Sequence, residues 1–167
     1  MSRSGYTDDT DDQWGLIRWR GAVRSAIRGA RGQAMLRELA AALDAMPEKR
    51  PTAESLVTAD GEFCTLGALG HARGLDMGAI DPEDYGAVAK VFGVADALVR
   101  EIVFENDECA SHAWLYVDTE VHGPMRRWET HQRTECIPNP RVAEQRWANM
   151  RRWVAANLIE DSRERIA

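Results

Sequence analysis

Residues 61–74 read Gly61-Glu62-Phe63-Cys64-Thr65-Leu66-Gly67-Ala68-Leu69-Gly70-His71-Ala72-Arg73-Gly74. Small residues dominate this stretch, so a short helix over about 66–72 can approach neighbouring backbone closely. A second polar motif, Glu105-Asn106-Asp107-Glu108, follows at the expected end of a later helix. We therefore expect the short helix and this motif to organise the centre of the fold.

Apolar residues recur at helical spacing in the segments around 14–27, 33–46, 81–92, 95–105 and 141–159. Leu56-Val57-Thr58 and Glu62-Phe63-Cys64 flank an Asp-Gly turn, which is typical of a short β-hairpin. Trp114-Leu115-Tyr116-Val117 has the composition of a further strand, inside an irregular, insertion-like region at 109–139. The sequence thus predicts an α+β fold: a mainly α-helical, compact single domain over 13–159 with one short β-hairpin. An acidic segment, 1–12, precedes it and a frayed tail, 160–167, follows.

The chain has 167 residues, of which 44% are hydrophobic, and a net charge of −6. No apolar run approaches the roughly 20 residues that span a bilayer, and the first ten residues are polar and acidic, unlike a signal peptide. The three cysteines are too sparse for a disulfide framework. We expect a soluble, cytoplasmic protein with reduced thiols and no membrane partner.

The charges are segregated along the chain. Residues 1–50 carry +2, residues 51–108 carry −9, and residues 109–167 carry +1. No acid interrupts 18–37, where six arginines fall: Arg18, Arg20, Arg24, Arg28, Arg31 and Arg37. Helical spacing would place Arg24, Arg28 and Arg31 on one face. This arginine face either docks onto the acidic 51–108 segment of its own chain or binds an acidic partner, protein or nucleic acid.

The helices expected on either side of Gly93 resemble a helix-turn-helix over 81–105, because Ala89 permits a close helix crossing and Gly93 a tight turn. Their charge opposes binding to DNA, since 81–108 holds eight acids against Lys90 and Arg100. A structural helix pair and a nucleic-acid reader are both compatible with the pattern.

Three patterns have the residue types of reactive or metal sites. Cys109, His112, His131 and Cys136 provide the two thiolates and two imidazoles of a structural zinc site, although the four also fit as unrelated loop residues. Cys64 enters a helix N-terminus with His71 seven residues on, too far along the helix for a nucleophile–base pair. The acids at 105–108 would form a divalent-metal site only with help from Asp60 or Asp76. We expect no catalytic residues and no cofactor other than the zinc alternative.

Several motifs are spread over most of the chain: Arg20-Gly21-Ala22-Val23-Arg24-Ser25-Ala26-Ile27-Arg28-Gly29, Arg31-Gly32-Gln33, Leu43-Asp44-Ala45-Met46-Pro47-Glu48-Lys49-Arg50, Phe63-Cys64-Thr65-Leu66-Gly67-Ala68-Leu69-Gly70, Glu105-Asn106-Asp107-Glu108 and Arg146-Trp147-Ala148-Asn149-Met150-Arg151-Arg152-Trp153-Val154. In these motifs the chain resembles a family of small uncharacterised proteins from tailed phages and prophages. The resemblance implies an accessory role in the cytoplasm of a bacterial host, and it brings no catalytic residues with it.

These observations favour a non-enzymatic protein that binds a host or phage macromolecule, with a protein as the expected partner. The alternative is a DNA- or RNA-binding protein that uses the helix pair at 81–105 and the arginine face at 18–37. A structural zinc-binding protein is the second alternative.

Overall fold

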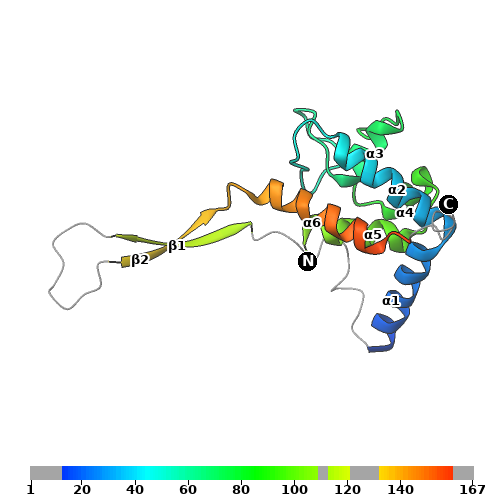
Figure 1. The fold of residues 1–167 in the computed structure, drawn as a ribbon, viewed down its shortest axis with the longest axis horizontal. Coiled ribbons are helices and arrows are strands. Elements are labelled where there is room, and N and C mark those ends of the chain that lie inside the picture. Colours follow the sequence, from blue (N-terminus) through cyan, green and yellow to red (C-terminus); the bar gives the residue numbers. More distant parts are fainter. Residues whose placement is uncertain (1–12, 109–112, 121–131, 160–167) are drawn as a thin grey trace, which may run out of the picture.

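Six helices and one two-stranded sheet form the described part of the chain, residues 13–108, 113–120 and 132–159, in this computed structural model (Figure 1). This combination confirms the predicted α+β class with a mainly helical body. None of the described helices has the length and apolar character to cross a membrane. In chain order the elements are α1 (Gln13–Arg28), α2 (Ala30–Ala45), α3 (Thr65–Ala72), α4 (Tyr85–Phe92), α5 (Asp96–Asp107), β1 (Trp114–Glu120), β2 (Gln132–Pro138) and α6 (Val142–Asn157).

Helix α5 is the centre of the helical body, where it contacts α1, α3, α4 and α6. Leu98, Val99 and Ile102 on this helix are fully buried. Helix α2 contacts α1, α3 and α6, so the two helices together hold the layers of the body in place. The core is therefore built from helix-to-helix packing of apolar side chains, the main source of stability for a domain of this size.

The small residues of α3 allow close backbone contact, as the sequence predicts. A Cβ atom added at Gly67 would lie 1.8 Å from the carbonyl oxygen of Leu56, so only glycine fits there. Cys64 caps the helix, since its Sγ accepts a hydrogen bond from the Gly67 N–H at 3.3 Å. The helix ends before Gly74, which has the left-handed φ of +70°.

The expected hairpin around residues 56–64 is reduced to one antiparallel bridge, between Val57 and Phe63. Its turn forms as predicted, with Gly61 at a φ of +80°. The pairing stops because the chain enters α3 directly after Cys64. The two-stranded sheet lies instead in the region expected to be irregular, and β1 includes the strand predicted at Trp114-Leu115-Tyr116-Val117. β1 pairs with β2 in antiparallel register from Trp114 opposite Pro138 to Glu120 opposite Gln132.

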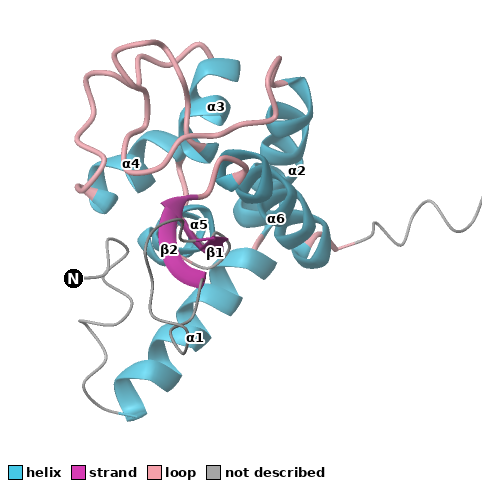
Figure 2. Ribbon diagram, turned by 90° about the vertical axis from the view of Figure 1, so that its left-hand side faces the viewer, coloured by secondary structure: helices cyan, strands magenta, loops and turns pink. Residues whose placement is uncertain are grey.

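The sheet forms an arm that projects from the helical body (Figure 1), and Figure 2 views the same arm from its free end. Its two strands contact each other and have few contacts with the helices. A backbone hydrogen bond of 2.8 Å from the Asn139 N–H to the Ala113 carbonyl oxygen closes the base of the arm. The arm will be called the β1–β2 arm below.

A polar network ties the Glu-Asn-Asp-Glu motif to the rest of the core. Asn106 is buried; its Oδ1 accepts from Thr65 Oγ1 at 2.6 Å and its Nδ2 donates to the Thr52 carbonyl at 3.0 Å. Arg146 of α6 is also buried, and its guanidinium donates to the carbonyl oxygens of Asn106 and Pro51, both at 2.8 Å. The network thereby joins α3, α5, α6 and the loop after α2, which bears out the central role expected for the two motifs.

Candidate functional site

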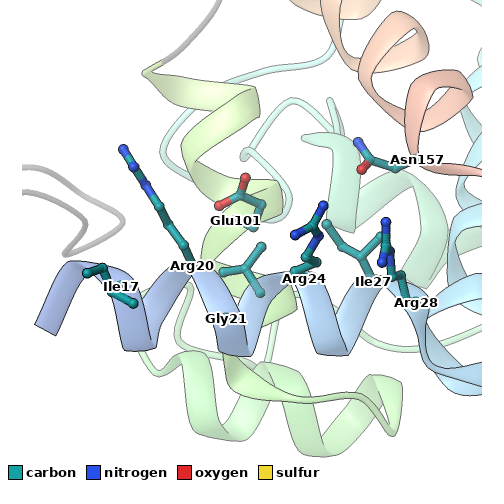
Figure 3. Close-up of a pocket in the computed structure, with 9 residues that line it drawn as sticks. Ile17, Arg20, Gly21, Arg24, Ile27, Arg28, Glu101 and Asn157 are labelled. Carbon is teal, nitrogen blue, oxygen red and sulfur yellow. The ribbon is translucent and has the colours of Figure 1, made fainter. Parts of the chain in front are cut away.

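Four of the arginines predicted to form a binding face are exposed on α1, which has no acid: Arg18, Arg20, Arg24 and Arg28. Among them, Arg20, Arg24 and Arg28 line an open hollow of about 700 Å³. Glu101 of α5 and Asn157 of α6 complete its wall (Figure 3). The hollow thus lies between α1, the middle of α5 and the C-terminal end of α6. We call the hollow and its arginines the α1 surface.

The arginines of α1 differ in their ion pairing from arginines such as Arg73 and Arg151. Arg151 forms a bidentate pair with Asp44 at 2.7 and 2.9 Å, and Arg73 pairs with Glu38 at 2.7 Å. In the described residues, no ion pair is found for the five arginines predicted to bind a partner, Arg18, Arg20, Arg24, Arg28 and Arg31. Helix α1 packs against α5, which belongs to the acidic 51–108 segment, but within the described residues these arginines form no ion pair with that segment.

Two features make the α1 surface more than a charged patch. Trp14 and Ile17, near the beginning of α1, expose 72% and 52% of their area. Large apolar side chains beside arginines are the residue types that carry most of the energy in protein–protein contacts. The position of α1 is also fixed, because Val23 and Ile27, which lie at the base of the hollow, are buried in the core.

The corner between α1 and α2 corrects one expectation. Gly29 adopts an extended conformation, with ψ at 152°, and α2 begins at Ala30. Arg31 therefore lies in the first turn of α2 and does not continue the face that Arg24 and Arg28 share. Gly32 is required at this corner, because an added Cβ would meet the Ala26 carbonyl oxygen at 2.0 Å.

The buried Gln33, which the sequence analysis overlooked, connects the same corner to α6. Its Nε2 donates to the carbonyl oxygens of Ile27 and Asn157, both at 2.9 Å, and its Oε1 accepts from the Ile159 N–H at 2.8 Å. The Arg31-Gly32-Gln33 motif is thus a structural corner that fixes Asn157 at the rim of the hollow. A single polar glutamine after Gly32 gives no periodic pattern that would indicate this role.

The helix pair α4–α5 forms with the expected turn, since Gly93 caps α4 at a φ of +70°. The start of α4 differs, because Asp84 caps the helix by accepting from the Ala87 N–H at 2.9 Å, so residues 81–84 form a turn instead of the first helical turn. No residue of α5 is fully exposed. The only arginine of α5, Arg100, pairs with Asp96 at 3.1 Å and stacks on Tyr85 and Trp19. Helix α5 is therefore not placed to enter a groove of DNA, because other helices cover it.

Three of the four predicted zinc ligands lie outside the described residues. Cys109, His112 and His131 belong to that part of the chain, whereas Cys136 is exposed in β2. Within residues 13–108, 113–120 and 132–159, no group of three or more metal-ligating side chains is found, including around Asp60 and Asp76. Within the Glu-Asn-Asp-Glu motif, Asp107 Oδ2 accepts a hydrogen bond from the Glu54 N–H at 3.4 Å.

Cys64 and His71 do not face each other as nucleophile and base. Cys64 is buried at the N-terminus of α3, where its sulfur caps the helix. His71 is exposed and stacks on Phe63, with 4.7 Å between ring centroids. The buried cysteine also lies near Arg146, a guanidinium whose pKa is lowered chiefly by burial and raised in part by the charge of Asp107.

Comparisons with protein families, curated proteins and solved structures give no match to this chain.

Proposed function

We propose that this chain is a non-enzymatic binding protein that docks an acidic surface of a partner protein onto its α1 surface. The observation that carries the proposal is the set of exposed, ion-pair-free arginines in the described structure, on a helix without acids. The four positive charges of α1 repel one another, and an acidic partner would reduce this repulsion.

Arginine also suits the role chemically. Its planar guanidinium binds a carboxylate through two parallel hydrogen bonds, as Arg151 does with Asp44 within this fold. On the α1 surface, Arg20, Arg24 and Arg28 are three such groups spaced one helical turn apart. Trp14 and Ile17 add apolar area that a partner would cover. Burial of this area would contribute affinity, whereas the ion pairs would mainly set the orientation of the partner and its association rate.

DNA or RNA is the second candidate, and the same acid-free helix favours it. The support is weaker than for a protein, because the net charge of −6 repels a polyanion and α5 is covered by other helices. A nucleic-acid contact would therefore use the α1 surface alone. The resemblance to phage and prophage proteins makes a bacterial cell the expected setting for either partner.

A pull-down from bacterial lysate tests the proposal. Tagged wild-type protein is compared with the variant Arg24→Glu/Arg28→Glu, and each lysate is divided into nuclease-treated and untreated halves. The matched control is Arg37→Glu/Arg152→Glu, which reverses two exposed arginines outside the hollow.

A protein that survives nuclease treatment and is lost only from the Arg24/Arg28 variant is the expected result. Recovery of nucleic acid from the untreated half alone would favour the second candidate. Capture of the same protein in equal amounts by the wild type and by both charge-reversed variants would refute the role of the α1 surface.

A further inference from the structure

The β1–β2 arm exposes apolar side chains that a free hairpin cannot bury. Trp114 is 57% exposed and Tyr116 79%, and Leu115, Val117 and Ile137 are each more than a third exposed. An isolated two-stranded hairpin is at best marginally stable in water. An arm of this composition gains stability when another surface covers it, and the described helices of its own chain do not.

Register and alternation divide the arm into two faces. Residues directly opposite each other share a face, so Trp114, Tyr116, Asp118 and Glu120 of β1 lie on one face with Cys136 and Pro138 of β2. This face is aromatic near the body and acidic toward the free end. Thr134 Oγ1 donates to Asp118 Oδ1 at 2.7 Å across the same face, which holds the carboxylate in place. Over both described strands, the charged residues Asp118, Glu120, Arg133 and Glu135 sum to −2.

The α1 surface has the complementary order of side chains. Along α1, Trp14 and Ile17 come first, and Arg20, Arg24 and Arg28 follow. At about 1.5 Å per helical residue, Trp14 to Arg28 spans roughly 21 Å. At about 3.3 Å per strand residue, Trp114 to Glu120 spans roughly 20 Å. The two elements thus match in length, in the order apolar then charged, and in opposite sign of charge.

The spacing of the charges also matches when the two elements run in the same direction. Measured from Trp14, Arg20 and Arg24 lie roughly 9 and 15 Å along α1, and Arg28 lies roughly 21 Å along it. Measured from Trp114, Asp118 lies roughly 13 Å along β1 and Glu120 roughly 20 Å. Asp118 would fall between Arg20 and Arg24, and Glu120 would meet Arg28.

We propose that the β1–β2 arm of one copy of this chain docks on the α1 surface of a second copy, which names the partner of the function proposed above and depends on that function. The contact cannot form within one chain, because the arm projects from one end of the body and α1 lies toward the other (Figure 1). Reciprocal exchange of arms closes a twofold dimer, the commonest symmetry of soluble assemblies.

Sedimentation of the full-length protein over a range of concentrations and salt tests this inference by charge exchange. Arg24→Glu/Arg28→Glu and Asp118→Arg/Glu120→Arg should each raise the dimer dissociation constant by about tenfold or more, since two attractive pairs become repulsive. An equimolar mixture of the two variants should dimerise again, because each acidic surface then faces a basic one. Glu135→Arg, on the opposite face of the arm, is the matched control and should leave the dimer intact.

The mixture keeps the test decisive even if one variant loosens the arm. Failure of the mixture to dimerise, while both variants keep the wild-type circular dichroism, would overturn the inference. A wild type that stays monomeric but captures another protein or a nucleic acid through Arg24 and Arg28 would overturn it and leave the α1 surface as the binding site. A monomer that captures nothing in the lysate assay would overturn both proposals.

Discussion

Arg146 offers the sharpest test of how this fold is held together, through the substitution Arg146→Ala. The side chain is only 7% exposed and donates to two carbonyl oxygens, those of Asn106 and Pro51, at 2.8 Å each. The Asn106 carbonyl belongs to the last turn of α5, where the positive charge of Arg146 also interacts favourably with the negative end of the helix dipole. Alanine would leave both carbonyls without this donor and open a gap between α5, α6 and the loop after α2.

The size of the effect follows from these contacts. Two hydrogen bonds from a charged donor are worth about 1.5–3 kcal/mol each. Burial lowers the pKa of Arg146, which shows that desolvation of the guanidinium costs part of this gain. We expect a net loss of about 3 kcal/mol in the free energy of unfolding, a large share of the roughly 5–15 kcal/mol of a typical domain.

Urea unfolding followed by tryptophan fluorescence measures this loss. With a slope of about 2 kcal/mol per molar urea, the midpoint should fall by about 1.5 M. Arg146→Lys keeps the positive charge, but a lysine ammonium lacks the forked guanidinium that reaches both carbonyl oxygens. This variant should therefore lose about half as much free energy of unfolding as Arg146→Ala. Arg152→Ala, an exposed arginine on the same helix, is the control and should change stability by no more than about 0.5 kcal/mol. A shift for Arg146→Ala no larger than that of the control would refute the reasoning.

Two further predictions concern the core. Gly67→Ala should lower the free energy of unfolding by at least about 3 kcal/mol, because the added Cβ would overlap the Leu56 carbonyl oxygen. Gly21→Ala has open space around it and should raise the free energy of unfolding by about 0.5–1 kcal/mol. Thermal melts in which Gly67→Ala is as stable as Gly21→Ala would contradict the packing described for the two glycines. Asn106→Ala should cost about 3 kcal/mol, since it strands the buried Thr65 hydroxyl and the Thr52 carbonyl. In a double-mutant cycle, Thr65→Val should add less to Asn106→Ala than it costs alone, and simple additivity would show that the two side chains are not coupled.

Local patterns predicted most of the helical body. Apolar residues at helical spacing placed α1, α2, α5 and α6 to within a few residues, and Gly93 and Gly74 marked the ends of α4 and α3. These features are encoded within one or two helical turns, so neighbouring residues suffice to detect them. The charge pattern also located the arginines of α1, because a long segment without acids is visible in the sequence itself.

The long-range contacts were visible only in three dimensions. The predicted hairpin was placed at the Asp-Gly turn, but the chain enters α3 there too soon for strands to form. The sheet forms instead at β1 and β2, where apolar residues on both faces hide the alternation of polar and apolar residues that marks a strand. Arg146 occupies a buried position of α6 because its partners come from Pro51 and Asn106, which no local period records. The helices and the charge of α1 can be read from the sequence, because both depend on residues that are near neighbours along the chain. The burial of α5, the lack of ion pairs at the α1 arginines within the described structure and the projection of the arm can be seen only in the fold. Each of them depends on segments that are far apart in the sequence.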